Sequence, residues 1–288
     1  EISRFWLETR SMLASVPPKA SLDSVDEWSD RTITTYGVVM SSFDHTKVRA
    51  WYTLPNGTPP VHGWPAILTM PSYSGNLVLP GFFARYGYAT LSLYPRAQGE
   101  SQHEWVLDQD LHQLLYNVTD PDSYYFRGAY MDCIRGLDFL ESRSEVDAGR
   151  LAVTGSSQGG GLTLATASLD RRVKTAIARF PSLCNFPVAL EDATFDAFNH
   201  GRILKYLTQH PDRKVSVMET LAYFDNINLV ENIKCPVFMS VAMKDVDHPY
   251  RAIMSVFEKI PTFKSIVVYR SSTGLETGGS NVDFNRHS

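Results

Sequence analysis

Short apolar segments alternate with helical stretches along most of this chain. The apolar segments are bounded by turn residues and cover residues 65–70, 89–94, 151–154, 175–180, 237–241 and 266–269. Residues 126–142 place apolar side chains on one helical face, and helical patterns also separate several of the other segments. Strands that alternate with helices predict an α/β fold, in which helices cover both faces of a mostly parallel sheet.

The first 60 residues depart from this alternation. Residues 3–16 carry apolar side chains at helical spacing and precede a pair of prolines. Residues 31–42 and 47–55 are rich in β-forming residues on either side of a polar turn. We therefore predict that residues 1–60 form an N-terminal extension, which consists of a helix and an antiparallel β-hairpin.

Residues 185–232 also break the rhythm, because they are helical by pattern and lie between two late strands. Their length favours a helical insertion over a simple crossover connection. A chain of 288 residues suits one large α/β domain, so we predict a single domain over residues 1–288.

Composition limits the classes of partner. Hydrophobic residues make up 43% of the chain and charged residues 20%, and the net charge is −4 with no block of like charges. The chain can therefore bury a sizeable core, and it lacks the basic patches that bind nucleic acid or an anionic membrane. The apolar segments are too short to span a bilayer. The histidines show no metal-ligand spacing, and no phosphate-binding or dinucleotide motif is present, so we expect neither metal nor cofactor.

The three cysteines are scattered along the chain and form no Cys-x-x-Cys pair. This number and spacing do not indicate a disulfide framework. The first residue is Glu1, which implies that any signal peptide has already been removed. We expect a cytoplasmic protein, with an exported protein as the alternative.

The sharpest motif is Gly-x-Ser-x-Gly at residues 155–159, directly after the apolar segment 151–154. On a strand-to-helix turn this motif is the nucleophile elbow, which pushes the serine hydroxyl out above the sheet. Small residues follow it in a helical pattern. We therefore predict that Ser157 is a catalytic nucleophile, and the alternative is a Gly/Ser turn without chemistry. In such a site the backbone N–H of the next residue, Gln158, is one donor of the oxyanion hole.

Several further motifs occur in a recognisable order. They are Phe5-Trp6, Tyr73-Ser74-Gly75, Arg96-Ala97-Gln98-Gly99, residues 124–128 and Tyr223-Phe224-Asp225. Together with the elbow, they resemble the acetyl xylan esterase and cephalosporin-C deacetylase family, carbohydrate esterase family seven, of the α/β-hydrolase fold. The resemblance extends to about Gly274. It implies that Tyr73 supplies the second oxyanion donor, and that Arg96 and Gln98 brace the loops around the site.

The resemblance also selects the acidic member of a Ser–Asp–His triad. The family has an aspartate four residues before a proline, which corresponds to Asp245 ahead of Pro249. Asp247 is the competing candidate. The role of this carboxylate would be to fix the tautomer of the catalytic histidine and to stabilise its charged form.

The general base is missing at its expected position. The family has Gly-His-Glu after the last strand, whereas this chain has Leu275 between a glycine and a glutamate. We expect His248 to begin the next helix and not to reach Ser157. His287 in the tail is then the remaining candidate for the base. A natural loss of the base and an altered or incomplete C-terminus are the alternatives, and each predicts weak ester hydrolysis or none.

Two functional hypotheses follow. The first is a serine esterase that removes acetyl groups from acetylated sugars such as xylan oligosaccharides, or from cephalosporin-type acetate esters. The second is a catalytically impaired family member, suggested by Leu275, that binds a carbohydrate or a partner protein. The resemblance also implies a homo-oligomer, such as a ring-shaped hexamer.

Overall fold

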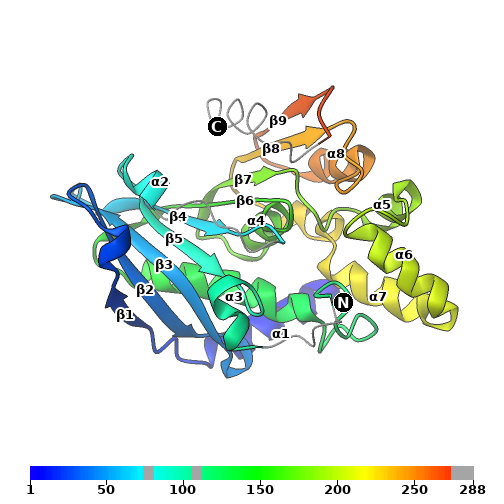
Figure 1. Ribbon diagram of the computed structural model, residues 1–288, viewed down its shortest axis with the longest axis horizontal. Coiled ribbons are helices and arrows are strands. Elements are labelled where there is room, and N and C mark those ends of the chain that lie inside the picture. The colour runs from blue at the N-terminus through cyan, green and yellow to red at the C-terminus, as the bar shows by residue number, and fades with distance from the viewer. Residues whose placement is uncertain (74–80, 106–111, 274–288) are drawn as a thin grey trace.

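The structure is a computed structural model that describes residues 1–73, 81–105 and 112–273 (Figure 1). Its strands are β1 Ser21–Ser24, β2 Ile33–Ser41, β3 Lys47–Pro55, β4 Trp64–Met70, β5 Ala89–Tyr94, β6 Val146–Ser156, β7 Val173–Arg179, β8 Val237–Ala242 and β9 Lys264–Tyr269. Its α-helices are α1 Ile2–Ala14, α2 Gly81–Ala84, α3 Tyr125–Glu141, α4 Gln158–Leu169, α5 Phe186–Asp192, α6 His200–Gln209, α7 Lys214–Phe224 and α8 Tyr250–Lys259.

The strands within the described ranges form one sheet in the order β1-β2-β3-β5-β4-β6-β7-β8-β9. Pairing is antiparallel from β1 to β5 and parallel from β5 through to β9. All six residues of β5 are buried. Because successive side chains of a strand point to opposite faces, the sheet is covered on both sides at its centre. The predicted α/β fold with a mostly parallel sheet is therefore confirmed, and each predicted strand is present.

The N-terminal extension forms as predicted. Strands β2 and β3 pair in register from Ile33 opposite Pro55 to Ser41 opposite Lys47. The indole of Trp6 in α1 stacks on Tyr130 of α3, with ring centroids 5.2 Å apart. This contact holds α1 against the helix that covers the middle of the sheet. Strand β1 was not predicted, because its four residues are mostly exposed and carry no buried alternation.

The predicted helical insertion comprises α5, α6 and α7, between β7 and β8. Figure 1 shows it at the end of the molecule opposite strands β1, β2 and β3. The buried carboxylate of Asp225, just after α7, accepts hydrogen bonds from the backbone N–H groups of Asn185 (2.6 Å) and Phe186 (2.7 Å). The two ends of the insertion are thereby joined. None of the helices in the described part of the chain is long and apolar enough to cross a membrane.

Candidate active site

The predicted site residues converge at one edge of the sheet. Strands β4, β6, β7 and β8 are neighbours and run parallel. Tyr73 follows β4, Ser157 follows β6 and Ser182 follows β7. Asp245 and His248 lie in the connection between β8 and α8. The carboxyl ends of adjacent parallel strands open onto the same crevice, and ligands bind there in open α/β sheets.

Ser157 occupies a sharp turn between β6 and α4, as the motif predicts. Its backbone has φ 56° and ψ −118°, a conformation that is costly for any residue with a side chain and is found at functional turns. Its N–H donates to the carbonyl oxygen of Arg179 (2.9 Å), and its own carbonyl oxygen accepts from Gly161 (3.1 Å) and Ser182 (2.9 Å). These bonds to β7, to α4 and to the segment after β7 hold the strained turn in place.

The two glycines of the motif, and Gly161 shortly after it, are required by close backbone contacts. A Cβ atom on Gly155 would lie 2.4 Å from the carbonyl carbon of Gly159. On Gly159 it would lie 2.3 Å from the carbonyl oxygen of Met70, and on Gly161 it would lie 2.4 Å from that of Ser182. The elbow can therefore fold tightly on itself and pack against the end of β4 and the segment after β7 only because these positions lack side chains.

A chain of hydrogen bonds joins Ser157, His248 and Asp245. The Ser157 hydroxyl oxygen lies 2.8 Å from Nε2 of His248, and Nδ1 of the same ring lies 2.9 Å from Oδ2 of Asp245. All three residues are buried. This arrangement matches the geometry of a Ser–His–Asp triad, in which the imidazole stands between a hydroxyl and a carboxylate.

The expectation that His248 cannot reach Ser157 is wrong. Oδ1 of Asp245 accepts the backbone N–H groups of Asp247 (2.9 Å) and His248 (3.0 Å), so the chain after β8 makes a tight turn. Pro249 then precedes α8, and the residue before a proline is biased away from helical geometry. The ring of His248 is consequently turned back towards the sheet. Leu275 and His287 lie outside the described residues.

Asp247, the competing acid, has a different contact. Its Oδ1 accepts the backbone N–H of Phe198 at 2.6 Å. Phe198 lies just before α6, and its ring contacts that of Tyr73 with centroids 5.2 Å apart. Asp247 therefore fastens the helical insertion to the loop that carries His248, while Asp245 contacts the imidazole.

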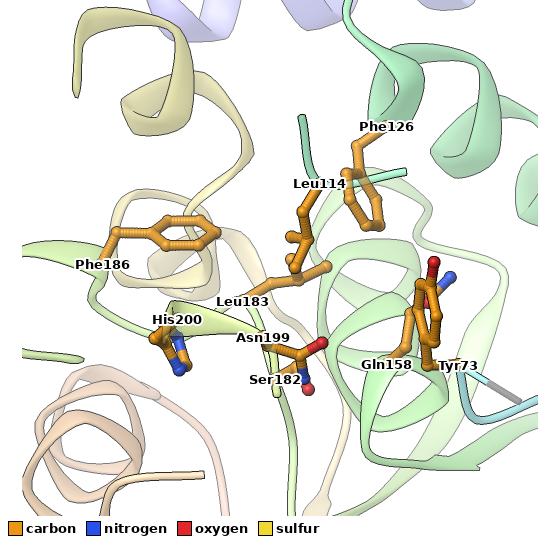
Figure 2. Close-up of a pocket in the computed structure, with 9 residues that line it drawn as sticks. All are labelled: Tyr73, Leu114, Phe126, Gln158, Ser182, Leu183, Phe186, Asn199 and His200. Carbon is orange, nitrogen blue, oxygen red and sulfur yellow. The ribbon is translucent and has the colours of Figure 1, made fainter. Parts of the chain in front are cut away.

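A small cavity lies beside the elbow (Figure 2). Its volume is about 10 Å³, and its walls come from the loops after β4 and β7, the start of α4 and the helical insertion. It is lined by Tyr73, Leu114, Phe126, Gln158, Ser182, Leu183, Phe186, Asn199 and His200. The two residues expected to supply the oxyanion hole, Tyr73 and Gln158, thus border one cavity. Ser182, whose hydroxyl oxygen is 3.4 Å from that of Ser157, was not predicted because no motif marks it.

Arg96 braces the surrounding loops. Its guanidinium makes two hydrogen bonds of 2.9 Å to the buried carboxylate of Asp132 in α3 and one of 3.0 Å to the carbonyl oxygen of Phe43. The side chain of Gln98 is also buried, and its Nε2 lies 3.4 Å from Oε1 of Gln158. A buried bidentate pair with a further acceptor fixes the loop after β5 rigidly.

Two histidines near the cavity are held in the neutral form by burial. Burial lowers the pKa of His200 to about 4, and the neighbouring imidazole of His248 acts in the same direction. Burial also lowers the pKa of His112 to about 3, with a contribution from Arg202. The ring of His112 stacks on that of Tyr73 with centroids 4.2 Å apart. The surroundings of the site are therefore sensitive to acid.

We expect the protein to lose stability as the pH falls from 7 to 5. The pKa of His200 is about 4 in the folded chain and 6.5 without burial, so the unfolded chain takes up a proton at higher pH. For this residue alone the free energy of unfolding should drop by about 2 kcal/mol over that interval. Urea denaturation at both pH values measures the drop.

The matched variants for this measurement are His200→Phe and His103→Phe, the latter at an exposed position. His200→Phe should show a pH dependence smaller by about 2 kcal/mol, and His103→Phe should behave like the unmodified chain. Equal pH dependence in all three proteins would show that His200 titrates normally in the folded state.

The chain matches known proteins over nearly its whole length. A family model for acetyl xylan esterases (AXE1) matches residues 1–283. Among curated proteins, the acetyl esterase Axe7A of Xylanibacter ruminicola is 25% identical over 256 residues, which cover 85% of this chain and 56% of that protein. The chain therefore spans about half the length of this curated relative.

Solved structures give the same match. An acetyl xylan esterase from Paenibacillus sp. R4 has a TM-score of 0.89 and 30% sequence identity, with coverage of 99% of this chain and 92% of that one. Acetyl xylan esterase 1 from Thermoanaerobacterium sp. JW/SL YS485 has a TM-score of 0.86 at 23% identity and the same coverage. At that lower identity the likeness shows the fold alone. The predicted α/β-hydrolase fold is confirmed.

Proposed function

The chain belongs to the acetyl xylan esterase family, and from this premise we propose that it is a serine esterase that removes acetyl groups from acetylated sugars. The observation that carries the proposal is the hydrogen-bonded chain from Ser157 through His248 to Asp245. It supplies a base beside the nucleophile, and the hypothesis of an impaired family member rested on the lack of one. Among acetylated sugars we propose xylan oligosaccharides, with cephalosporin-type acetate esters as further substrates.

In the first half of the reaction, Ser157 attacks the ester carbonyl carbon. Its hydroxyl proton passes to Nε2 of His248, which is 2.8 Å away. Nδ1–H of the ring donates to Asp245, whose carboxylate stabilises the charged imidazole. The tetrahedral intermediate then collapses, the alcohol leaves with the proton from Nε2, and the acetyl group stays on Ser157.

In the second half, water replaces the alcohol. It gives a proton to Nε2 of His248 as its oxygen attacks the acetyl carbonyl carbon. Collapse of the second tetrahedral intermediate releases acetate, and Ser157 recovers its proton from the ring. The same imidazole therefore acts as base and acid in each half.

The negative oxygen of both intermediates needs hydrogen-bond donors. We assign this role to the backbone N–H groups of Tyr73 and Gln158. Gln158 begins α4, and the first N–H groups of a helix have no partner within it and lie at its positive end. The close approach of Gly159 to Met70 brings the loop after β4 against the elbow, where the second donor is needed.

Hydrolysis of an acetylated xylo-oligosaccharide tests the proposal. We expect the chain to release acetate, and Ser157→Ala to lower the rate to that left by binding and the oxyanion hole, about 10⁶-fold down. Cephalosporin C serves as the second substrate. Release of acetate at an equal rate by Ser157→Ala would contradict the proposed function.

We also propose that the protein is a homo-oligomer, and a ring-shaped hexamer is the assembly that the family resemblance suggests. Leu7 and Met12 in the N-terminal extension are 68% and 46% exposed, and we place the subunit contacts on this extension. Light scattering should give a multiple of 32.4 kDa. A monomer at micromolar concentration would count against the assembly.

A further inference from the structure

Two residues that line the cavity beside the elbow each carry a buried side-chain nitrogen without a hydrogen-bond partner among the described residues. The two nitrogens are Nδ1 of His200 and Nε2 of Gln158. Each residue is only 3% exposed. A buried polar atom without a partner costs about 1–3 kcal/mol, so two such atoms on residues that line one small cavity point to a polar group that binds there.

The surroundings of His200 make its Nδ1 an acceptor. The ring is hydrogen-bonded to the backbone of Asp247, and it packs edge-on against Phe186 with centroids 6.1 Å apart. Burial keeps the imidazole neutral, because it lowers the pKa to about 4. In a neutral imidazole one nitrogen carries the proton and the other accepts. The interaction with the Asp247 backbone favours the protonated ring, as a carbonyl acceptor does, and Nδ1 has no partner among the described residues. We therefore assign the proton to Nε2, which leaves a lone pair on Nδ1.

The surroundings of Gln158 make its Nε2 a donor. Its Oε1 accepts from Nε2 of Gln98 at 3.4 Å. The same Nε2 of Gln98 also donates to Oε1 of Gln113 at 3.5 Å. This run of amides fixes which end of the Gln158 side chain is oxygen and which is nitrogen, since a reversed amide would bring two donors together. The residues that line the cavity thus carry one unpaired acceptor, on His200, and one unpaired donor, on Gln158.

The volume of the cavity limits what can enter. At about 10 Å³ it has room for a group the size of a water molecule. A methyl group would fill the space and leave both nitrogens unpaired, whereas a hydroxyl has a donor and acceptors and can pair with either one. Ser182, which also lines the cavity, has its hydroxyl oxygen 3.4 Å from that of Ser157. The space is therefore adjacent to the reacting ester.

We propose that this cavity is a subsite for a free hydroxyl group on the alcohol part of the substrate, next to the ester oxygen. His200 and Gln158 are its specificity-determining side chains. The inference rests on the proposed esterase function and narrows it: the preferred substrates are acetate esters of diols and sugars that keep an unesterified neighbouring hydroxyl.

A matched pair of esters tests the subsite. In 2-hydroxyethyl acetate and propyl acetate, a hydroxyl and a methyl group occupy the same position relative to the ester. We expect kcat/KM for the hydroxyl ester to exceed that for propyl acetate by about 10- to 100-fold, as a site built to pair a hydroxyl rejects its apolar analogue. The ratio cancels effects on the triad that are common to both esters.

Two independent variants test whether the cavity causes the ratio of kcat/KM between the two esters. His200→Phe and Gln158→Met each remove one unpaired nitrogen, and Gln158→Met retains the backbone N–H. Each should bring the ratio towards 1, and His103→Phe, at an exposed position, should keep the original ratio. A ratio near 1 in the unmodified chain, or an unchanged ratio in both cavity variants, would overturn the inference.

Further outcomes separate this inference from its alternatives. If the unmodified chain hydrolyses both esters equally, the esterase function stands and the subsite is wrong. If it hydrolyses neither, the esterase function fails and the subsite with it.

Two other occupants of the cavity give different results. If His200→Ala speeds hydrolysis of propyl propanoate relative to propyl acetate without changing the ratio between the hydroxyl ester and propyl acetate, the cavity holds the acyl chain. If His200→Phe slows both esters equally and acyl-enzyme accumulates, the cavity holds the hydrolytic water. Both of these results also overturn the proposal.

Discussion

Replacement of His248 by glutamine is expected to lower kcat for acetate esters by about 10⁶-fold, equivalent to about 8 kcal/mol of transition-state stabilisation. Glutamine retains the size and polarity of the side chain, but its amide cannot take the proton of Ser157. With no base 2.8 Å from the hydroxyl oxygen, the serine attacks as a neutral alcohol. What remains is the contribution of substrate binding and the oxyanion hole.

Three variants serve as comparisons for His248→Gln. His103→Gln, at an exposed position, should have the activity of the unmodified chain. His287→Gln and Leu275→His test the hypotheses drawn from the sequence, since the first removes the alternative base and the second restores the family residue. A large loss in His287→Gln with none in His248→Gln would show that the tail supplies the base. A gain of several orders of magnitude in Leu275→His would show that the unmodified chain lacks an effective one.

Replacement of Asp245 by asparagine should lower kcat by about 10⁴-fold. Oδ2 of Asp245 is 2.9 Å from Nδ1 of His248, and the buried side chains of both residues are only 3% and 2% exposed. An asparagine amide has no charge to stabilise the imidazolium, and if its N–H₂ faces the ring it favours the tautomer with the proton on Nε2. That tautomer cannot accept a proton from Ser157.

Asp247→Asn is the matched control, because it makes the same chemical change two residues away. Asp247 contacts the backbone N–H of Phe198, and an asparagine oxygen can accept that bond. We expect less than about a tenfold change in kcat/KM. Circular dichroism checks that both variants fold. Equal losses in the two variants would mean that the carboxylates act together through loop structure and that Asp245 has no distinct role at the imidazole.

Much of the fold could be predicted from local pattern. Buried parallel strands appear in the sequence as short apolar segments, and β5 and β8 begin at the first residue of the predicted segments 89–94 and 237–241. The elbow was predictable because the positive φ of Ser157 and the backbone contacts of Gly159 allow few other sequences. The helical insertion was visible as a break in the strand–helix alternation. Strand β1 was not, since four mostly exposed residues leave no periodic signal.

The position of the base is the part of the site that the sequence does not predict. Because His248 is only three residues after Asp245, the local pattern indicates a side chain at the start of the next helix. Two local features carry the opposite signal. Asp245 caps the turn through the N–H groups of the residues that follow it, and Pro249 biases the residue before it, His248, away from helical geometry. Ser182 and the nitrogens at the cavity depend on contacts between distant segments, which no local pattern reports.

Covalent labelling of Ser157 by a fluorophosphonate tests the central claim most directly, because the reagent needs an activated serine. In the unmodified chain we predict that the label lies on Ser157, within the tryptic peptide that spans residues 151–171, and that fragmentation places it there rather than on Ser156. In His248→Gln the labelling rate should fall by several orders of magnitude, as the nucleophile loses its base. Labelling of Ser157 at an undiminished rate in His248→Gln, or recovery of the label on a different peptide, would contradict a triad of Ser157, His248 and Asp245.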